Sequence, residues 1–179
     1  GINTRANKVR RSPLSIVETE RLIVREWTLD DVDAAFAIFG DPEVTRYLPA
    51  GALKASREEM TATLHRVVGE YPQIRPMGFW AVVERASHLV VGASLLRPLP
   101  DDPRIEIGWH LARTHWGRGY ASEAAGGVLA WAQSQLHVPD PVAVIVPGNT
   151  RSEAVAARLG MSPGERELLF GLDVRVWTV

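Results

Sequence analysis

One stretch of the sequence, residues 104–136, constrains the fold of this chain more than any other. It places a short strand pattern, "RIEIGWHLA" (104–112), before a turn with two glycines, Gly117 and Gly119, and then a helical run. The first N–H groups of such a helix lack partners, and the helix dipole adds positive charge there. Glycine lets the backbone adopt positive φ and approach a phosphate closely. The stretch therefore predicts an anion-binding turn between a strand and a helix.

Several kinds of phosphate-binding loop share this outline. A Walker loop requires Gly-Lys-Ser/Thr, and no lysine stands near the turn. A dinucleotide-binding fingerprint needs a third glycine, where this chain has Ser122. Arg118 can add its guanidinium to the same anion. Two alternatives remain for this turn from the residues alone. It is either a pyrophosphate site of another kind, or it binds no phosphate.

The rest of the chain alternates between strand and helix patterns. Strands are predicted at 21–27, 78–85, 89–99, 104–112, 141–149 and, as a hairpin turning at Gly171, twice within 167–179. Helices are predicted at 28–40, 56–71, 120–136 and 150–160. Caps support two of them, since Ser56 with Glu59 forms a capping box and Gly160 is a suitable C-cap.

This order predicts an α+β fold of three layers. We expect a mixed, mostly antiparallel central sheet of about seven strands with helices on both faces. Residues 1–15 are polar and basic without a period, and we interpret them as a flexible tail. Residues 16–179 then form a single domain.

Composition excludes several classes of function. The net charge of −1 gives no electrostatic case for binding nucleic acid or a membrane surface. The absence of cysteine excludes disulfides, thiolate nucleophiles and cysteine-ligated metals. His65, His88 and His137 show no metal spacing, so no metal site is expected. No membrane span or signal peptide pattern is present, which favours a cytoplasmic location.

Four motifs in order resemble one family. "WGRGYASEA" (116–124) after a strand ending "IGWHLA" is similar to the coenzyme A loop of the GNAT acetyltransferases, of pattern Gln/Arg-x-x-Gly-x-Gly/Ala. Trp116 stands at its first position, a variant common in the RimJ/RimL-like branch. "TERLIVREW" (19–27), "GFWAVVE" (78–84) and "NTRSEAVAARLGM" (149–161) resemble that branch's opening strand, second strand and last helix.

The resemblance implies an acetyl-CoA site where the fourth and fifth strands, 104–112 and 141–149, splay apart. Backbone groups of residues 110–112 would pair with the pantetheine arm like a missing strand, and those of residues 117–121 would hold the pyrophosphate. Asn149 would anchor the last helix or contact the cofactor. The implied cofactor contacts are His110, Leu111, Ala112, Trp116, Gly117, Arg118, Gly119, Tyr120, Ala121, Ser122, Asn149 and Ser152.

The implied reaction is direct attack of an amine on the thioester, which calls for a base and for a backbone N–H donor at the splay. Glu106 is the first candidate base, because alternation places it on one strand face with Gly108 and His110. An ion pair with an arginine such as Arg25 is its structural alternative. His110 is either a second base or a packed histidine.

Ser152 matches the position where the branch is thought to place a serine near the sulfur, which makes it the candidate proton donor. A serine that bonds only to its local backbone is the alternative. The tyrosine that many members carry on the last helix is absent, which puts acid catalysis by tyrosine in doubt.

The acceptor pocket is expected to form from residues 40–56, the first two helices and the final hairpin. Its lining candidates are Asp41, Glu43, Tyr47, Trp80 and His110. The acceptor is a protein N-terminal α-amine or a small-molecule amine, and the protein is a monomer or homodimer. A non-catalytic acyl-CoA sensor and a nucleotide-binding protein that uses the same loop remain as alternatives.

Overall fold

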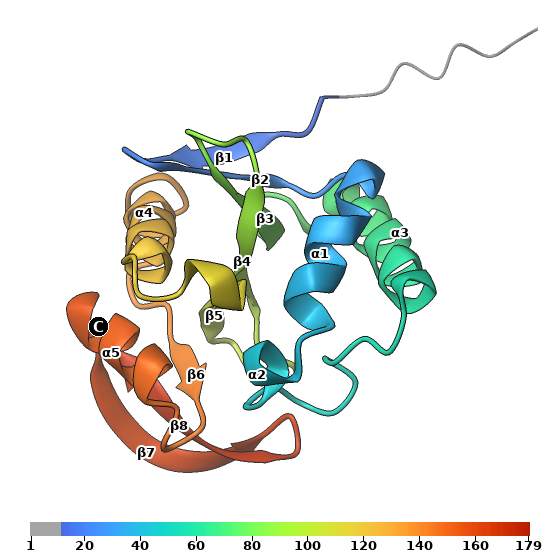
Figure 1. Cartoon of the computed structure of the whole chain (residues 1–179). Helices are drawn as coiled ribbons and strands as arrows, with labels where there is room; N and C mark the ends of the chain where they lie inside the picture. Colours follow the sequence, from blue (N-terminus) through green and yellow to red (C-terminus); the bar gives the residue numbers. More distant parts are fainter. Residues whose placement is uncertain (1–11) are drawn as a thin grey trace, which may run out of the picture.

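The computed structural model describes residues 12–179, which form two antiparallel sheets with helices around them (Figure 1). The strands are β1 (Ser15–Glu18), β2 (Leu22–Glu26), β3 (Gly78–Glu84), β4 (Val90–Pro98), β5 (Ile105–Leu111), β6 (Ala143–Ile145), β7 (Ser162–Leu169) and β8 (Leu172–Thr178). The helices are α1 (Val32–Phe39), α2 (Pro42–Thr45), α3 (Arg57–Ile74), α4 (Tyr120–Gln135) and α5 (Thr150–Arg158), with 3-10 turns η1 (Leu29–Asp31) and η2 (Arg113–His115).

The sheets have the strand orders β1-β2-β3-β4-β5 and β6-β8-β7. They meet at one parallel bridge between Glu106 and Val142. There the Ile107 N–H donates to the Val142 carbonyl and the Val142 N–H donates to the Ile105 carbonyl, both at 2.8 Å. Beyond these two bonds β5 and β6 separate. The predicted α+β fold with splayed strands is thus confirmed, although the central sheet is divided in two.

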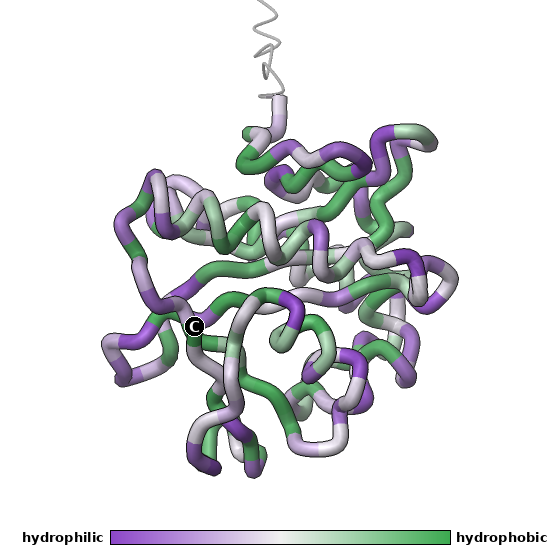
Figure 2. Tube along the Cα trace, turned by 90° about the vertical axis from the view of Figure 1, so that its left-hand side faces the viewer, coloured by the Kyte–Doolittle hydropathy of each residue, from purple (hydrophilic) through white to green (hydrophobic). Residues whose placement is uncertain are grey.

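Helices cover both faces of the larger sheet, α4 on one side and α1 with α3 on the other (Figure 1). On the α1 side, the Phe39 and Phe79 ring centroids lie 5.7 Å apart. On the α4 side, Trp80 meets Trp131 edge to face at 5.8 Å, a pairing worth about 0.5–1.5 kcal/mol beyond area burial. Figure 2 shows the hydrophobic residues concentrated along the central strands and the hydrophilic ones at the turns.

Two elements were not expected from the sequence. β1 begins at Ser15, the last residue of the predicted tail, and pairs antiparallel with β2. Residues 1–11 of that tail lie outside the described residues. The four-residue helix α2 occupies part of the predicted loop 40–56, and the Asp41 carboxylate caps it by accepting from the Glu43 N–H at 3.0 Å. In the part of the chain described, no helix is both long and apolar enough to cross a membrane.

Candidate active site

A cavity of about 1330 Å³ opens where β5 and β6 separate. One half is lined by α1, α2 and α3 with the adjoining strands, and the other by the α4 loop, β6 and α5. Pockets for single drug-sized ligands run to about 1000 Å³. The cavity therefore has room for a long cofactor and a second molecule, and we refer to its halves as the acceptor half and the donor half.

The glycine turn forms the entrance to the donor half. Gly117 and Gly119 have φ of 78° and 77°, and Gly119 is the N-cap of α4. A Cβ on Gly117 would meet nothing within 4 Å, and one on Gly119 would meet only the Arg21 guanidinium at 3.5 Å. Backbone conformation rather than crowding thus requires glycine here. The first N–H groups of α4 have no partner within the helix, an arrangement that can bind an anion.

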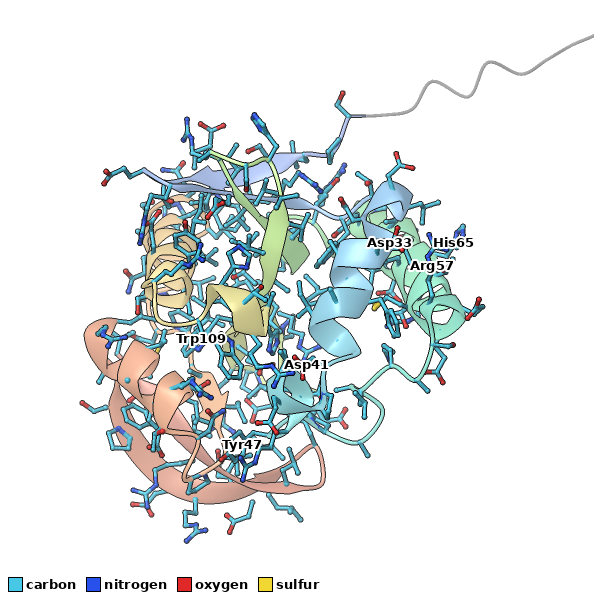
Figure 3. All side chains as sticks on the ribbon, in the orientation of Figure 1. Asp33, Asp41, Tyr47, Arg57, His65 and Trp109 are labelled. Carbon is cyan, nitrogen blue, oxygen red and sulfur yellow. The ribbon has the colours of Figure 1, made fainter. Side chains whose placement is uncertain are left out.

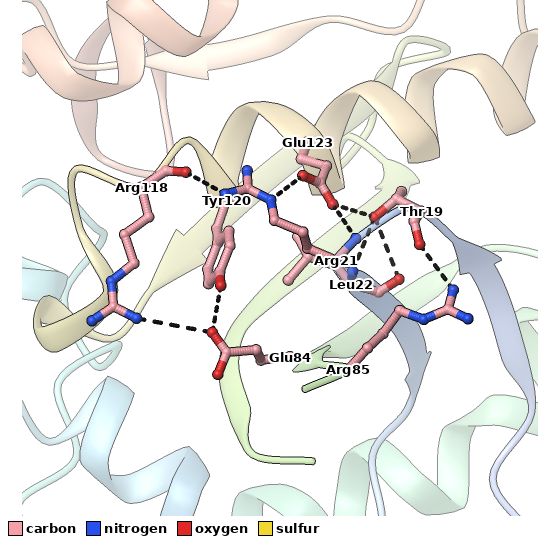
Figure 4. A network of polar contacts seen from close by, with 8 residues as sticks. All are labelled: Thr19, Arg21, Leu22, Glu84, Arg85, Arg118, Tyr120 and Glu123. Carbon is pink, nitrogen blue, oxygen red and sulfur yellow. Dashed lines mark hydrogen bonds and ion pairs between the residues drawn. The ribbon is translucent and has the colours of Figure 1, made fainter. Parts of the chain in front are cut away.

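The turn is held by the β1–β2 hairpin on one side (Figure 4). The Glu123 carboxylate in the first turn of α4 accepts from the Thr19 hydroxyl at 2.6 Å and from the Arg21 Nε at 2.7 Å. Arg21 also donates through Nη1 to the Arg118 carbonyl at 2.9 Å. Residues a hundred positions away in the chain thereby fix the glycine turn.

The Tyr120 side chain secures the glycine turn to β3. Its hydroxyl donates a short hydrogen bond to the Glu84 carboxylate, and the Arg21 guanidinium lies 4.5 Å from its ring centroid. This hydrogen bond raises the pKa of Tyr120 and lowers that of Glu84. Arg118 Nη1 lies 3.9 Å from the same carboxylate. The side chains of Tyr120 and Arg118 therefore point away from the cavity lining, and only their backbone groups remain available to an anion.

The open edge of β5 faces the splay. The Ile107 N–H points to β6 and the Ala112 N–H donates to Val91 of the neighbouring segment at 2.8 Å. Because strand peptide groups alternate in direction, the groups of Trp109 and Leu111 face the gap, whereas those of His110 and Ala112 face β4. The Trp116 Nε1 donates to the Leu111 carbonyl at 3.1 Å. The sequence interpretation named Leu111 and missed Trp109.

Helix α5 supplies the far wall of the donor half. The Asn149 side chain is its N-cap and accepts from the Ser152 N–H at 3.5 Å. The Ser152 hydroxyl lines the cavity and has no hydrogen-bond partner among residues 12–179. The local backbone bond that was its structural alternative is therefore not formed.

Two arginines on α5 were missed from the sequence. The Arg151 guanidinium carbon lies 3.8 Å from the Trp116 ring centroid, and the Arg158 Nη1 donates to the Ser122 hydroxyl at 3.5 Å. Both line the cavity beside the glycine turn. Their spacing of seven residues on one helix face was the available signal.

Glu106 lies at the base of the splay, and its partner is Arg97 of β4. The Arg97 Nε donates to Glu106 Oε2 at 3.1 Å, and the two residues are paired in the strand register. Arg25, the partner considered from the sequence, instead bonds to Asp31 at 2.8 Å. Burial raises the pKa of Glu106, while Arg97 opposes the shift.

His110 lines the cavity edge-on to Phe39, with ring centroids 5.6 Å apart. Burial and the nearby Arg97 charge lower the pKa of His110 to about 4, so the ring is neutral near pH 7. It therefore offers a hydrogen bond to a ligand rather than a charge.

The remaining predicted residues fall in different places (Figure 3). Tyr47 lines the acceptor half, and its hydroxyl donates to the Gly148 carbonyl at 3.5 Å. Asp41 binds Arg113 at 2.9 Å and so joins α2 to η2, outside the lining. Trp80 is buried against α4 on the opposite face of the sheet, which corrects its expected place in the acceptor pocket. No group of three potential metal ligands occurs among residues 12–179.

Known proteins share parts of this sequence and this fold. The sequence model of the acetyltransferase (GNAT) domain matches residues 21–162. The chain is 30% identical over 146 residues to the uncharacterised N-acetyltransferase YoaA of Bacillus subtilis, covering 81% of both chains. An acetyltransferase structure from Agrobacterium tumefaciens superposes with a TM-score of 0.75 at 25% identity, covering 94% of each chain. A structure of RimL, a ribosomal L7/L12 α-N-protein acetyltransferase in complex with coenzyme A, shares the fold with a TM-score of 0.76 at 16% identity, covering 93% of this chain and 97% of that one.

Proposed function

Because the chain belongs to the GNAT acetyltransferase family, we propose that it is a RimJ/RimL-like member that transfers the acetyl group of acetyl-CoA to a primary amine by direct attack in a ternary complex. One observation carries the proposal. The glycine turn, the open edge of β5 and the Glu106 carboxylate all border a single cavity that has room for two substrates.

The donor half fits the chemistry of acetyl-CoA. Its pyrophosphate suits the N–H groups of residues 117–121, and the Arg151 and Arg158 guanidiniums suit its phosphate charges. The peptide groups of Trp109 and Leu111 suit the amides of the pantetheine arm, which would add to the edge of β5 like a strand. Acetyl-CoA supplies the activated acyl group when bound.

On the acceptor side, Glu106 takes the proton from the ammonium group of the substrate. The free amine forms a bond to the acetyl carbon while the carbon–sulfur bond breaks, and the sulfur leaves with the electron pair. The nitrogen of the new amide releases its extra proton to solvent. The Ser152 hydroxyl, which has no other partner, donates a proton to that sulfur and regains one from solvent. The Trp109 N–H is the donor for the oxygen that gains charge. The Trp109 carbonyl and the Leu111 N–H remain for the amides of the pantetheine arm.

Calorimetry tests the donor half. We expect acetyl-CoA and coenzyme A to bind the wild type, and Gly119→Val to abolish that binding, because a β-branched residue is strained at a φ of 77°. Gly160→Val is the matched control, since Gly160 has a φ of 82° at the end of α5 and does not line the cavity. Wild-type affinity in Gly119→Val would show that the turn is not the cofactor site.

Release of free thiol in the presence of an amine tests the transfer itself. The non-catalytic acyl-CoA sensor is supported by the Arg97 partner of Glu106, which competes for the carboxylate. That alternative predicts binding of acetyl-CoA without thiol release from any amine in a broad panel. Turnover with any amine rejects it.

A further inference from the structure

Arg97 is a charged group in the acceptor half whose bonding capacity is largely unused. Its Nε–H binds Glu106, but neither terminal nitrogen has an acceptor among residues 12–179. The side chain remains 50% exposed to the cavity, while that of Glu106 is only 10% exposed. A guanidinium carries five N–H donors, and the pair of terminal nitrogens forms a fork that matches a carboxylate. Arg97 therefore presents a free anion-binding fork.

Phe170 covers the Arg97 guanidinium from the β7–β8 turn. The guanidinium carbon lies 5.7 Å from the ring centroid, and Phe170 lines the same cavity. Phe170 and Gly171 have φ of 54° and 74°, as the two central residues of a tight hairpin turn between Leu169 and Leu172 require. The hairpin thus places an aromatic ring beside the guanidinium while half of the Arg97 side chain stays exposed.

The other charges of the acceptor half do not provide an anionic surface. Glu70 is paired with Arg66 at 3.1 Å, and Glu106 is paired with Arg97. Glu43 is the third carboxylate of this half, and Arg46, Lys54 and Arg66 line it too. A polyamine or other polycation needs several free carboxylates, and the described lining offers only Glu43. The walls between the charges are apolar and are formed by residues that include Phe39, Leu48, Met60, Phe79 and Leu95.

Building on the proposed function, we propose that the acceptor is a free amino acid with an apolar side chain. Its α-amine reacts, and its α-carboxylate is free rather than part of a peptide bond. The Arg97 fork binds that carboxylate, and the second oxygen of Glu106 receives the ammonium group. The ammonium group gives one proton to Glu106, and the free amine forms the bond to the acetyl carbon and releases its second proton to solvent. The carbon–sulfur bond breaks, coenzyme A leaves as the thiol with a proton from Ser152, and the acceptor carboxylate is unchanged. The apolar walls hold the side chain.

This assignment separates amino acids from the N-terminus of a protein. In a peptide the α-amine is followed by an amide, which is neutral and cannot use both donors of the fork. A free amino acid also needs no room for a polypeptide beside Phe170, whereas the N-terminus of a protein does.

The first test uses the wild-type protein with matched acceptors at saturating acetyl-CoA, with thiol release as the readout. We expect kcat/KM for leucine and phenylalanine to exceed that for leucinamide and phenylalaninamide by about 10- to 100-fold, since loss of a charge-assisted pair leaves Arg97 unmatched. The assay also includes amines that lack the α-carboxylate, and short peptides. Equal or higher kcat/KM for amides, amines or peptides would overturn the amino acid assignment and leave the acetyltransferase function standing, whereas failure of acetyl-CoA to bind would refute the proposed function itself.

The second test uses variants. Arg97→Lys and Arg97→Gln are expected to raise KM for leucine and to remove the preference over leucinamide, with unchanged calorimetric affinity for coenzyme A as evidence of correct folding. Arg57→Gln is the control, because Arg57 pairs with Asp33 on the outer side of α1 and α3, outside the cavity (Figure 3). A preference retained in both Arg97 variants would overturn the role of the fork.

Discussion

Glu106 is subject to two opposing influences on its proton affinity. Burial disfavours the carboxylate and raises its pKa, while the Arg97 guanidinium stabilises the charge. The net shift is upward from 4.5, toward the range in which a base can accept a proton near neutral pH. Burial lowers the pKa of the neighbouring His110 to about 4, which makes it the weaker base. Of the two residues, Glu106 is thus the better proton acceptor.

The pH dependence of the rate tests this assignment. A base works only when ionised, so kcat/KM should fall as the pH drops through the raised pKa of Glu106. In Glu106→Gln we expect kcat to fall by about 100-fold, with this acid limb absent and the affinity for coenzyme A unchanged. Asp33→Asn, an exposed carboxylate outside the cavity, is the control. An unaltered pH–rate profile in Glu106→Gln would show that another group is the base.

The face of Glu106 was predictable, but its partner was not. Alternation along 104–112 places Glu106 and His110 on one face, and both line the cavity. Which arginine meets Glu106 depends on the register between β4 and β5, which no local pattern specifies. The position of Trp80 was predicted wrongly for a related reason. Which face of β3 borders the cavity depends on which helix covers each face, and Trp80 packs on Trp131 of α4.

At the scale of elements, the glycine turn depends on neighbours as well as on its own residues. The short Tyr120–Glu84 hydrogen bond and the Arg21–Glu123 pair secure it on two sides. None of these four side chains lines the cavity, so they act through the position of the turn.

Tyr120→Phe tests this positioning role. Loss of the hydroxyl removes the donor to Glu84 Oε2 and so costs stability, although Ser87 still donates to the other oxygen. We expect part of that cost to appear as a roughly 3- to 10-fold weaker affinity for coenzyme A, with the acceptor KM unchanged. Ser87→Ala is the matched control, because Ser87 donates to the other oxygen of Glu84 at 2.7 Å and lies away from the turn. Equal losses in both variants would indicate a merely structural role.

Long periodic elements were predicted more successfully than short ones. The helices α3, α4 and α5 match their predicted ranges closely because caps and apolar spacing define them. β1 and α2 have four residues each, too few to show a period. Each is fixed by tertiary partners, β1 by its pairing with β2 and α2 by the Asp41–Arg113 ion pair.

At the scale of the whole molecule, the two sheets touch at one bridge, and a small second core of Leu99, Val142 and Val176 lies beside it. A ligand in the donor half would contact both sheets, through β5 on one side and β6 with α5 on the other. Its binding energy would therefore stabilise the junction most.

Hydrogen exchange and thermal unfolding test this coupling. Coenzyme A at 100 times its Kd should stabilise the protein by about 2.7 kcal/mol, which corresponds to a rise in Tm of about 5–11 °C. Protection should increase most in residues 116–122 and 143–158 and least in β2 and β3, which lie away from the splay. Uniform protection, or none near the junction, would contradict a ligand that bridges the sheets.

Thr19 and Arg21 donate hydrogen bonds to Glu123 of α4, and these contacts limit where the chain can be truncated or fused to another protein. The stretch shared with the family runs from 21 to 162, and cutting there would delete Thr19, β1 and the hairpin that carries Phe170. β6 would also lose β8, its antiparallel partner. The smallest transplantable unit is therefore wider than the matched block, since the flanks hold the Thr19 contact to α4, the partner strand of β6 and the Phe170 contact to Arg97.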